Sequence, residues 1–169
     1  MPTAAADSAP HARSARRIAP VLWALLGLFV LRVAGQALVA FLDVRWLPSM
    51  DEWYSGLLAY RFLLPAQLLI IVLLAAVCRD FTRGHGGFVT PRPRLGNWVV
   101  WLGYAYFAAM IARYVMRMAR HPEARWLGGV IPIVFHCVLA TFLILFGRHH
   151  QGSGVDPAQR PGDMRGARS

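Results

Sequence analysis

Lysine is absent from this 169-residue chain, and all eighteen of its basic residues are arginine. Only eight residues are acidic, and charged residues make up 15% of the chain. The formal net charge of +10 raises the question of nucleic-acid binding. The arginines are distributed among the termini, turns and expected helix ends, however, and form no continuous basic face. This distribution argues against nucleic acid as a partner and is typical of the charge bias that orients membrane proteins.

Cysteine is also scarce, with two residues in the whole chain. Cys78 and Cys137 are each isolated in the sequence, and the expected topology places one at the membrane edge and the other near the bilayer centre. We therefore predict no disulfide, no CxxC redox motif and no structural zinc site. His85, His149 and His150 lack the carboxylate or cysteine spacing that would support a metal site, so no metal is expected.

Recognisable catalytic motifs are missing as well. The glycines of residues 84–87 lack the Lys-Ser/Thr of a P-loop and follow no strand. No serine or threonine forms a nucleophile elbow, and no helix presents paired carboxylates. The weak catalytic candidates lie in the two expected outer loops, where Asp51, Glu52 and His121 would act on a phosphate- or acyl-bearing lipid.

Long apolar runs are what the sequence does contain. The chain is 57% hydrophobic with a mean hydropathy of +0.44. Four runs, at about residues 18–42, 56–77, 97–116 and 127–147, each reach the length of about 20 residues that crosses a hydrocarbon core of about 30 Å. The first run is too long for the apolar part of a cleavable signal peptide. The sequence therefore predicts an all-α integral membrane protein, with a four-helix transmembrane bundle over residues 18–147.

The two ends of the chain are predicted to be disordered, basic tails. Residues 1–17 and 148–169 are rich in small, polar and basic residues and show no periodicity. Four spans place both tails on the same side of the membrane. Arginine is more abundant there and in the loop at 78–96 than in the acid-containing loops on the other side, so the positive-inside rule assigns this side to the cytoplasm. The predicted location is the cytoplasmic (inner) membrane, with multiple passes.

Polar side chains occur at two expected depths within the spans. Counting about 1.5 Å per residue from the inner boundaries places Gln67, Tyr106 and His136 about 14 to 17 Å into the membrane, near its centre. Three different helices thus offer a hydrogen-bonding group at one level. Gln67 is also a candidate to satisfy the backbone carbonyl that Pro65 frees in the preceding turn.

A second, cationic layer is expected in the outer half. Arg32, Arg61 and Arg113 fall about 21 to 24 Å into the membrane by the same count, and Gln36 follows Arg32 by one turn. An arginine in hydrocarbon costs about 2.5 to 3.5 kcal/mol on insertion scales, and no acidic residue lies within a span. Arg61 and Arg113 can extend to the surface or pair with the acidic residues of the outer loops, Asp51, Glu52 and Glu123. Arg32 with Gln36 is expected either to join helices or to bind an anion or a carbonyl-bearing ligand.

The fourth span re-enters the membrane after an arginine stripe and carries His136. The stripe comprises Arg113, Arg117 and Arg120, whose spacing of four and three places them on one side of a helix. His136 is either a hydrogen-bonded packing residue or a ligand-binding residue. Haem would need a second histidine at this depth, a partner subunit or Met110 as the other axial ligand. The sequence identifies no cofactor.

The functional hypothesis is a small membrane subunit or accessory protein with a polar intramembrane site. Its ligand would be lipophilic, a quinone or an acidic lipid, or the site would hold a partner helix. The alternatives are the lipid enzyme described above and an oligomeric transporter or channel, although the apolar inner halves of the spans argue against a conduit. Expected partners are the bilayer, another membrane protein and further copies of the chain. The predicted ligand-binding residues are Arg32, Gln36, Arg61, Gln67, Tyr106, Arg113 and His136.

Overall fold

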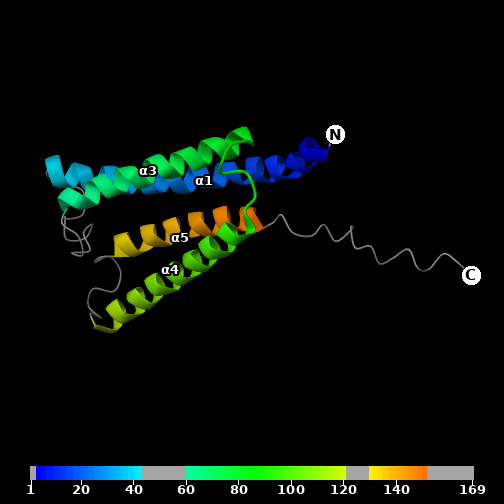
Figure 1. Cartoon of the computed structure of the whole chain (residues 1–169). Coiled ribbons are helices and arrows are strands. Elements are labelled where there is room, and N and C mark those ends of the chain that lie inside the picture. Colours follow the sequence, from blue (N-terminus) through cyan, green and yellow to red (C-terminus); the bar gives the residue numbers. More distant parts are fainter. Residues whose placement is uncertain (1–2, 43–59, 121–129, 152–169) are drawn as a thin grey trace, which may run out of the picture.

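The computed structural model describes residues 3–42, 60–120 and 130–151, and over these ranges the chain is helical with no strand. The helices are α1 (Thr3–Leu42), α3 (Tyr60–Arg83), α4 (Pro93–Arg120) and α5 (Val130–Gln151). All four are long and apolar enough to cross a membrane. The predicted all-α class is confirmed, and these helices indicate a multi-pass membrane protein (Figure 1).

The helix bounds correct the prediction of a disordered tail over residues 1–17. α1 begins at Thr3, because a segment rich in alanine, the strongest helix former, continues the apolar helix towards the N-terminus. Ala15 is fully buried, and Arg16 Nη2 donates a hydrogen bond to the carbonyl of Arg83 over 2.8 Å. α5 likewise continues to Gln151. Residues 152–169 of the predicted C-terminal tail lie outside the described residues.

The helices form an open row and not a closed bundle. α1 packs against α3 and α5, and α5 packs against α4, whereas α3 and α4 do not pack on each other within the described ranges. Figure 1 shows α4 diverging from α5 away from the end where the described N- and C-terminal residues lie. We call that end the terminal end and the opposite one the far end. The lateral order is therefore α3, α1, α5, α4, although at the terminal end Phe81 of α3 also contacts α5.

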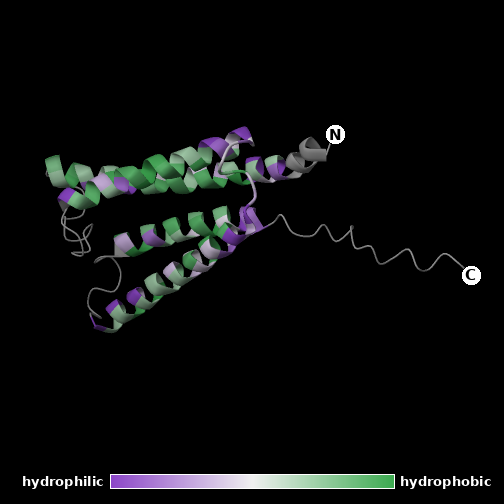
Figure 2. Cartoon of the chain, in the orientation of Figure 1, coloured by the Kyte–Doolittle hydropathy of each residue, from purple (hydrophilic) through white to green (hydrophobic). Residues whose placement is uncertain are grey.

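An apolar core occupies the terminal half of the row. Phe81 of α3 is fully buried, and its ring centroid lies 5.9 Å from that of Phe146 and 4.7 Å from that of His149, both on α5. Apolar residues predominate along the middle of α1 and α3 (Figure 2), and many large apolar side chains are exposed; Leu69 and Trp98 are each 70% exposed. Such surfaces suit a lipid environment. The core consists of Ala15, Ala19, Leu22, Leu26, Leu74, Val77, Cys78, Phe81, Val89 and Phe142.

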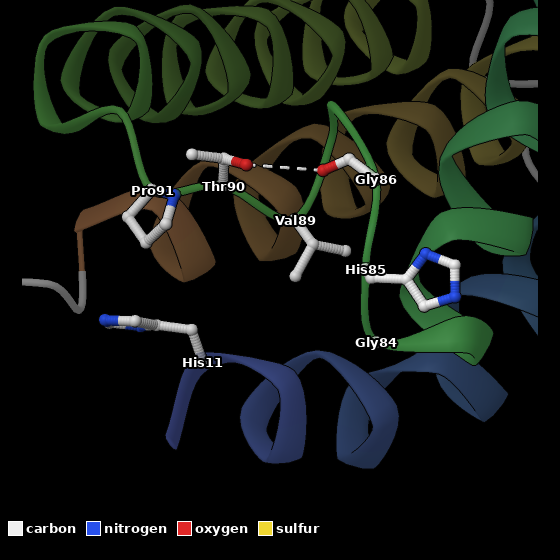
Figure 3. A pocket seen from close by; sticks show the side chains of 7 residues that line it. All are labelled: His11, Gly84, His85, Gly86, Val89, Thr90 and Pro91. Carbon is white, nitrogen blue, oxygen red and sulfur yellow. Dashed lines mark hydrogen bonds between the residues drawn. The ribbon is translucent and has the colours of Figure 1, made fainter. Parts of the chain in front are cut away.

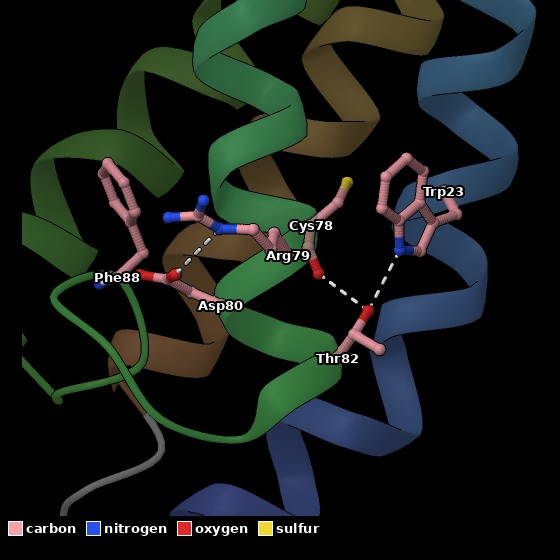
Figure 4. A network of polar contacts seen from close by, with 6 residues as sticks. All are labelled: Trp23, Cys78, Arg79, Asp80, Thr82 and Phe88. Carbon is pink, nitrogen blue, oxygen red and sulfur yellow. Dashed lines mark hydrogen bonds and ion pairs between the residues drawn. The ribbon is translucent and has the colours of Figure 1, made fainter.

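Hydrogen bonds fix the register of α1 against α3 at the terminal end. The indole Nε1 of Trp23 donates to Thr82 Oγ1 over 3.0 Å, and that hydroxyl donates to the carbonyl of Cys78 over 2.8 Å (Figure 4). Between Cys78 and Thr82 in the sequence, Asp80 accepts a hydrogen bond from the backbone N–H of Phe88 over 3.5 Å. The last turns of α3 thereby hold both α1 and the loop that follows.

That loop requires glycine where α3 ends. Gly84 has a φ of +72° and donates its N–H to the carbonyl of Asp80 over 2.9 Å, the left-handed geometry typical of a helix C-terminus. A Cβ at Gly84 would lie 2.6 Å from Arg16 Nε. Gly86, with a φ of +129°, lies directly against the Asp80 carboxylate. The chain then enters α4 at Pro93, a residue favoured in the first helical turn.

Small residues allow α4 and α5 to approach closely. A Cβ at Gly96 would lie 2.8 Å from the carbonyl oxygen of Gly147, and one at Gly103 would lie 2.7 Å from Ile144 Cγ1. Gly96 and Gly103 on α4, like Ala140 and Gly147 on α5, are seven residues apart and therefore share a helix face. Close backbone approach through small residues is a principal means of association between membrane helices.

Replacing Gly147 by alanine should therefore destabilise the fold. Its Cβ would meet the backbone N of Val100 at 2.9 Å and the carbonyl oxygen of Gly96 at 3.0 Å. We expect a loss of about 1 to 3 kcal/mol, the range for overpacking, in the free energy of unfolding measured by SDS titration in mixed micelles. Gly27→Ala is the matched control, because nothing lies within 4 Å of that Cβ. Equal stability of the two variants would contradict the packing argument.

Candidate functional site

Buried polar side chains connect α1 to α3 towards the far end. Gln36 is fully buried and Gln67 is 4% exposed. Gln67 Nε2 donates to Gln36 Oε1 over 3.1 Å, and Arg32 Nη1 donates to the same oxygen over 3.4 Å. Because a guanidinium can only donate, the Gln36 amide must present its oxygen to Arg32, and Gln67 must then approach with its nitrogen.

This orientation leaves one buried donor and one buried acceptor. Gln36 Nε2 and Gln67 Oε1 have no hydrogen-bond partner in the described part of the chain. A buried polar group without a partner typically costs about 1 to 3 kcal/mol. The two amides come from different helices, so together they present complementary hydrogen-bonding groups in an apolar environment.

A second hydrogen-bonded pair joins α4 to α5. The hydroxyl of Tyr106 lies 2.9 Å from Nδ1 of His136, and the two ring centroids are 5.7 Å apart in an edge-to-face arrangement. When the phenol donates to Nδ1, the imidazole carries its proton on Nε2, which makes that atom a donor. This pair is half-buried.

Arg32 lies near both pairs. Its guanidinium donates to Gln36 and is close enough for its charge to act on Tyr106 and His136. Every helix of the row therefore contributes a polar group to the same region. We call this set of groups the polar track, and its members are Arg32, Gln36, Gln67, Tyr106 and His136.

The structure corrects the predicted separation of Gln67 from Arg32 and Gln36 into two layers. The depth expected for Gln36 assumes that the first span begins at residue 18. This assumption places Gln36 too far along the membrane normal. In the structure Trp23 of α1 is hydrogen-bonded to Thr82 of α3. Counted from this contact, Gln36 and Gln67 lie at nearly equal distances along α1 and α3, and they are hydrogen-bonded to each other. Gln67 donates to Gln36 in this arrangement, which gives it a partner other than the backbone near Pro65.

The other two predicted binding residues lie apart from the track. Arg61 is exposed on α3, with its guanidinium carbon 4.8 Å from the centroid of the Phe62 ring. Arg113 is half-buried on α4, and its charge acts on Tyr106 and His136. Arg113 thus borders the polar track, whereas Arg61 has no contact with it.

The candidates for catalysis, Asp51, Glu52 and His121, lie outside the described residues. Asp80 is the single carboxylate within residues 11–42, 61–120 and 131–151. It lies at the terminal end, where Arg79 and the Phe88 N–H approach it. Paired carboxylates for acid-base catalysis therefore do not occur in these three ranges.

Two histidines contribute to the lining of a hollow of about 200 Å³ at the terminal end. His11 and His85 line it, and Figure 3 shows their imidazoles pointing in opposite directions. Behind the loop, the Nε2–H of His149 donates to the carbonyl of Val89 over 3.1 Å. Within the described ranges, no three His, Cys, Asp or Glu side chains form a group that could hold a metal ion. We assign these contacts to fastening the loop on α5.

The burial of His149 and His150 was not anticipated from the sequence. The sequence predicts a tail from Arg148 onwards, but α5 continues through both histidines, and they are 7% and 1% exposed. The ring of His150 lies edge-to-face against Phe146, with centroids 4.5 Å apart. The available signal was the helical spacing of Phe146, His149 and His150, which places all three on one face.

Comparison with family models, with curated proteins and with solved structures returns no match. The class is therefore defined by the chain's own features: four helices able to cross a membrane, joined by a polar track. Any function must be argued from these residues.

The hydrogen bond between Gln36 and Gln67 should be measurable by a double-mutant cycle. With Gln36→Leu and Gln67→Leu, we expect a coupling energy of about 0.6 to 1.7 kcal/mol, the range for hydrogen bonds between membrane helices. Steric trapping in bicelles would measure the unfolding free energies. The control cycle combines Gln67→Leu with Gln151→Leu, which lies at the other end of the row and should be additive. Coupling in the control, or none between Gln36 and Gln67, would refute the contact.

Proposed function

We propose that this chain is a small membrane subunit or accessory protein whose polar track binds a lipophilic, carbonyl-bearing ligand of the quinone class. The observation that supports this is the pair of buried amide groups without partners in the described residues, Gln36 Nε2 and Gln67 Oε1. A ligand that accepts one hydrogen bond and donates another would satisfy both.

Quinones have this chemistry in their two redox states. The carbonyl oxygens of the quinone accept hydrogen bonds from amide, guanidinium or imidazole donors, and the hydroxyls of the quinol also donate to an amide oxygen. Around the track, Gln36 Nε2 and the Arg32 guanidinium are donors, and Gln67 Oε1 is an acceptor. An isoprenoid tail would remain in the apolar surroundings of the helices. An acidic lipid or a polar side chain of a partner helix is the competing occupant.

We further propose the cytoplasmic membrane as the location, with both termini in the cytoplasm. The described part of the terminal end carries eight arginines, supporting this orientation by the positive-inside rule. They are Arg13, Arg16, Arg17, Arg79, Arg83, Arg92, Arg94 and Arg148.

Reporter fusions test the orientation. Alkaline phosphatase, which is active only outside the cytoplasm, should be inactive when fused after residue 151 and active when fused within residues 121–129. A fluorescent protein that matures only in the cytoplasm should give the reverse result at the same two positions. Activity of the phosphatase after residue 151 would overturn the proposed topology.

Ligand binding is tested with the full chain in nanodiscs loaded with a quinone. Native mass spectrometry should detect the quinone on the wild-type protein. Gln36→Leu should bind it roughly tenfold more weakly, because one hydrogen bond at a buried site is worth about 1.4 kcal/mol. Arg61→Gln is the control, since Arg61 is exposed and does not contact the track.

Two outcomes would overturn the proposal. One is a wild-type protein that neither retains a quinone through purification nor binds an added one. The other is equal weakening by Arg61→Gln and Gln36→Leu, which would show that binding does not involve the track. Circular dichroism of each variant establishes that the helices are intact.

A further inference from the structure

Three arginines gather around a hollow at the far end of α4. Arg113, Arg117 and Arg120, together with Met116, line a cavity of about 240 Å³. Arg113 and Arg117 are half-buried, and Arg120 is exposed. Their spacing directs all three guanidinium groups to the same side of the helix.

The described residues provide no negative charge for this cluster. The single ion pair among them joins Arg79 to Asp80, at the opposite end of the row. Like charges on neighbouring helix positions repel one another. An anion between the three arginines would reduce this repulsion and would itself be attracted to each guanidinium. Each planar guanidinium can donate two parallel hydrogen bonds to two oxygens of a phosphate group.

The helix dipole accounts for only part of the cluster. Arg117 and Arg120 lie in the last turn of α4, where cations stabilise the partial negative charge of a helix C-terminus. That effect falls off within one turn and does not extend to Arg113, which is nearer the middle of the helix and half-buried. Arg113 therefore needs another partner.

The surroundings of the hollow suit a lipid phosphate. The hollow lies at the end of an apolar helix, at the level expected for lipid head groups. Beside it, Ile111 and Val115 are exposed to 46% and 59%, which provides an apolar surface for acyl chains. Met116 adds an apolar wall to the hollow itself.

We propose that Arg113, Arg117 and Arg120 form a phosphate-binding site at the far end of α4. Its ligand is the phosphate oxyanion, either in the head group of an anionic phospholipid or as a free ion. The site shares only Arg113 with the border of the polar track and does not depend on the quinone. Variants at Arg117 therefore test the phosphate site separately.

The experiment uses the full chain in nanodiscs of phosphatidylcholine containing a minor fraction of phosphatidic acid. Native mass spectrometry should show phosphatidic acid retained by the wild type, and Arg117→Gln should reduce this retention roughly tenfold. Arg61→Gln removes one charge at the same end of the row but lies outside the hollow, and it should retain the lipid as the wild type does. Arg120→Gln, at an exposed position, provides a second variant if Arg117→Gln does not fold.

Inorganic phosphate distinguishes the two sources of the ligand. Binding of phosphate to the protein in phosphatidylcholine nanodiscs, lost in Arg117→Gln, identifies a free ion as sufficient. Retention of phosphatidic acid without binding of phosphate identifies the lipid. The proposal is overturned if neither binds, or if Arg61→Gln and Arg117→Gln have equal effects. Quinone binding should be unchanged in Arg117→Gln, so the phosphate proposal and the quinone proposal can be refuted independently.

Discussion

The requirement to satisfy buried polar groups without a carboxylate governs this structure. Arg32 lies in an apolar helix, and Asp80, at the opposite end of the row, is the single carboxylate within residues 11–42, 61–120 and 131–151. The Arg32 guanidinium donates to a neutral amide, Gln36, which must also accept from Gln67. This sharing fixes the amide orientations and leaves one donor and one acceptor buried without described partners. The proposed ligand site is a direct consequence of this arrangement.

The two ends of the helix row have different physical characters. The terminal half contains the apolar core, the tight glycine contacts between α4 and α5, and the register-setting bond from Trp23 to Thr82. These contacts leave little room for a ligand. Towards the far end α4 diverges from α5 (Figure 1). The arginine hollow lies at this end of α4, and Gln36 and Gln67 of the polar track lie in the far halves of α1 and α3. The closely packed terminal half thus holds the helices together, and the far half carries most of the polar track and the arginine hollow.

The two proposed sites differ in what they would recognise. The polar track offers neutral amides, a phenol and an imidazole around one guanidinium, which suits carbonyl and hydroxyl oxygens. The hollow on α4 offers three guanidinium groups and suits a phosphate. Arg113 lies between them and acts electrostatically on Tyr106 and His136.

Four helices able to cross a membrane are predictable from the sequence, because length and hydropathy are properties of each segment alone. The sequence also identifies the polar residues of the track, since such side chains within a span stand out regardless of their neighbours. The packing of the helices was needed to show that Gln67 is hydrogen-bonded to Gln36, that Arg61 lies outside the track, and that α3 and α4 do not pack on each other in the described ranges. These facts depend on the axial shift and lateral order of whole helices. Contacts such as Trp23 with Thr82 and Gly96 with Gly147 set that shift and order, and a count along one helix does not contain them.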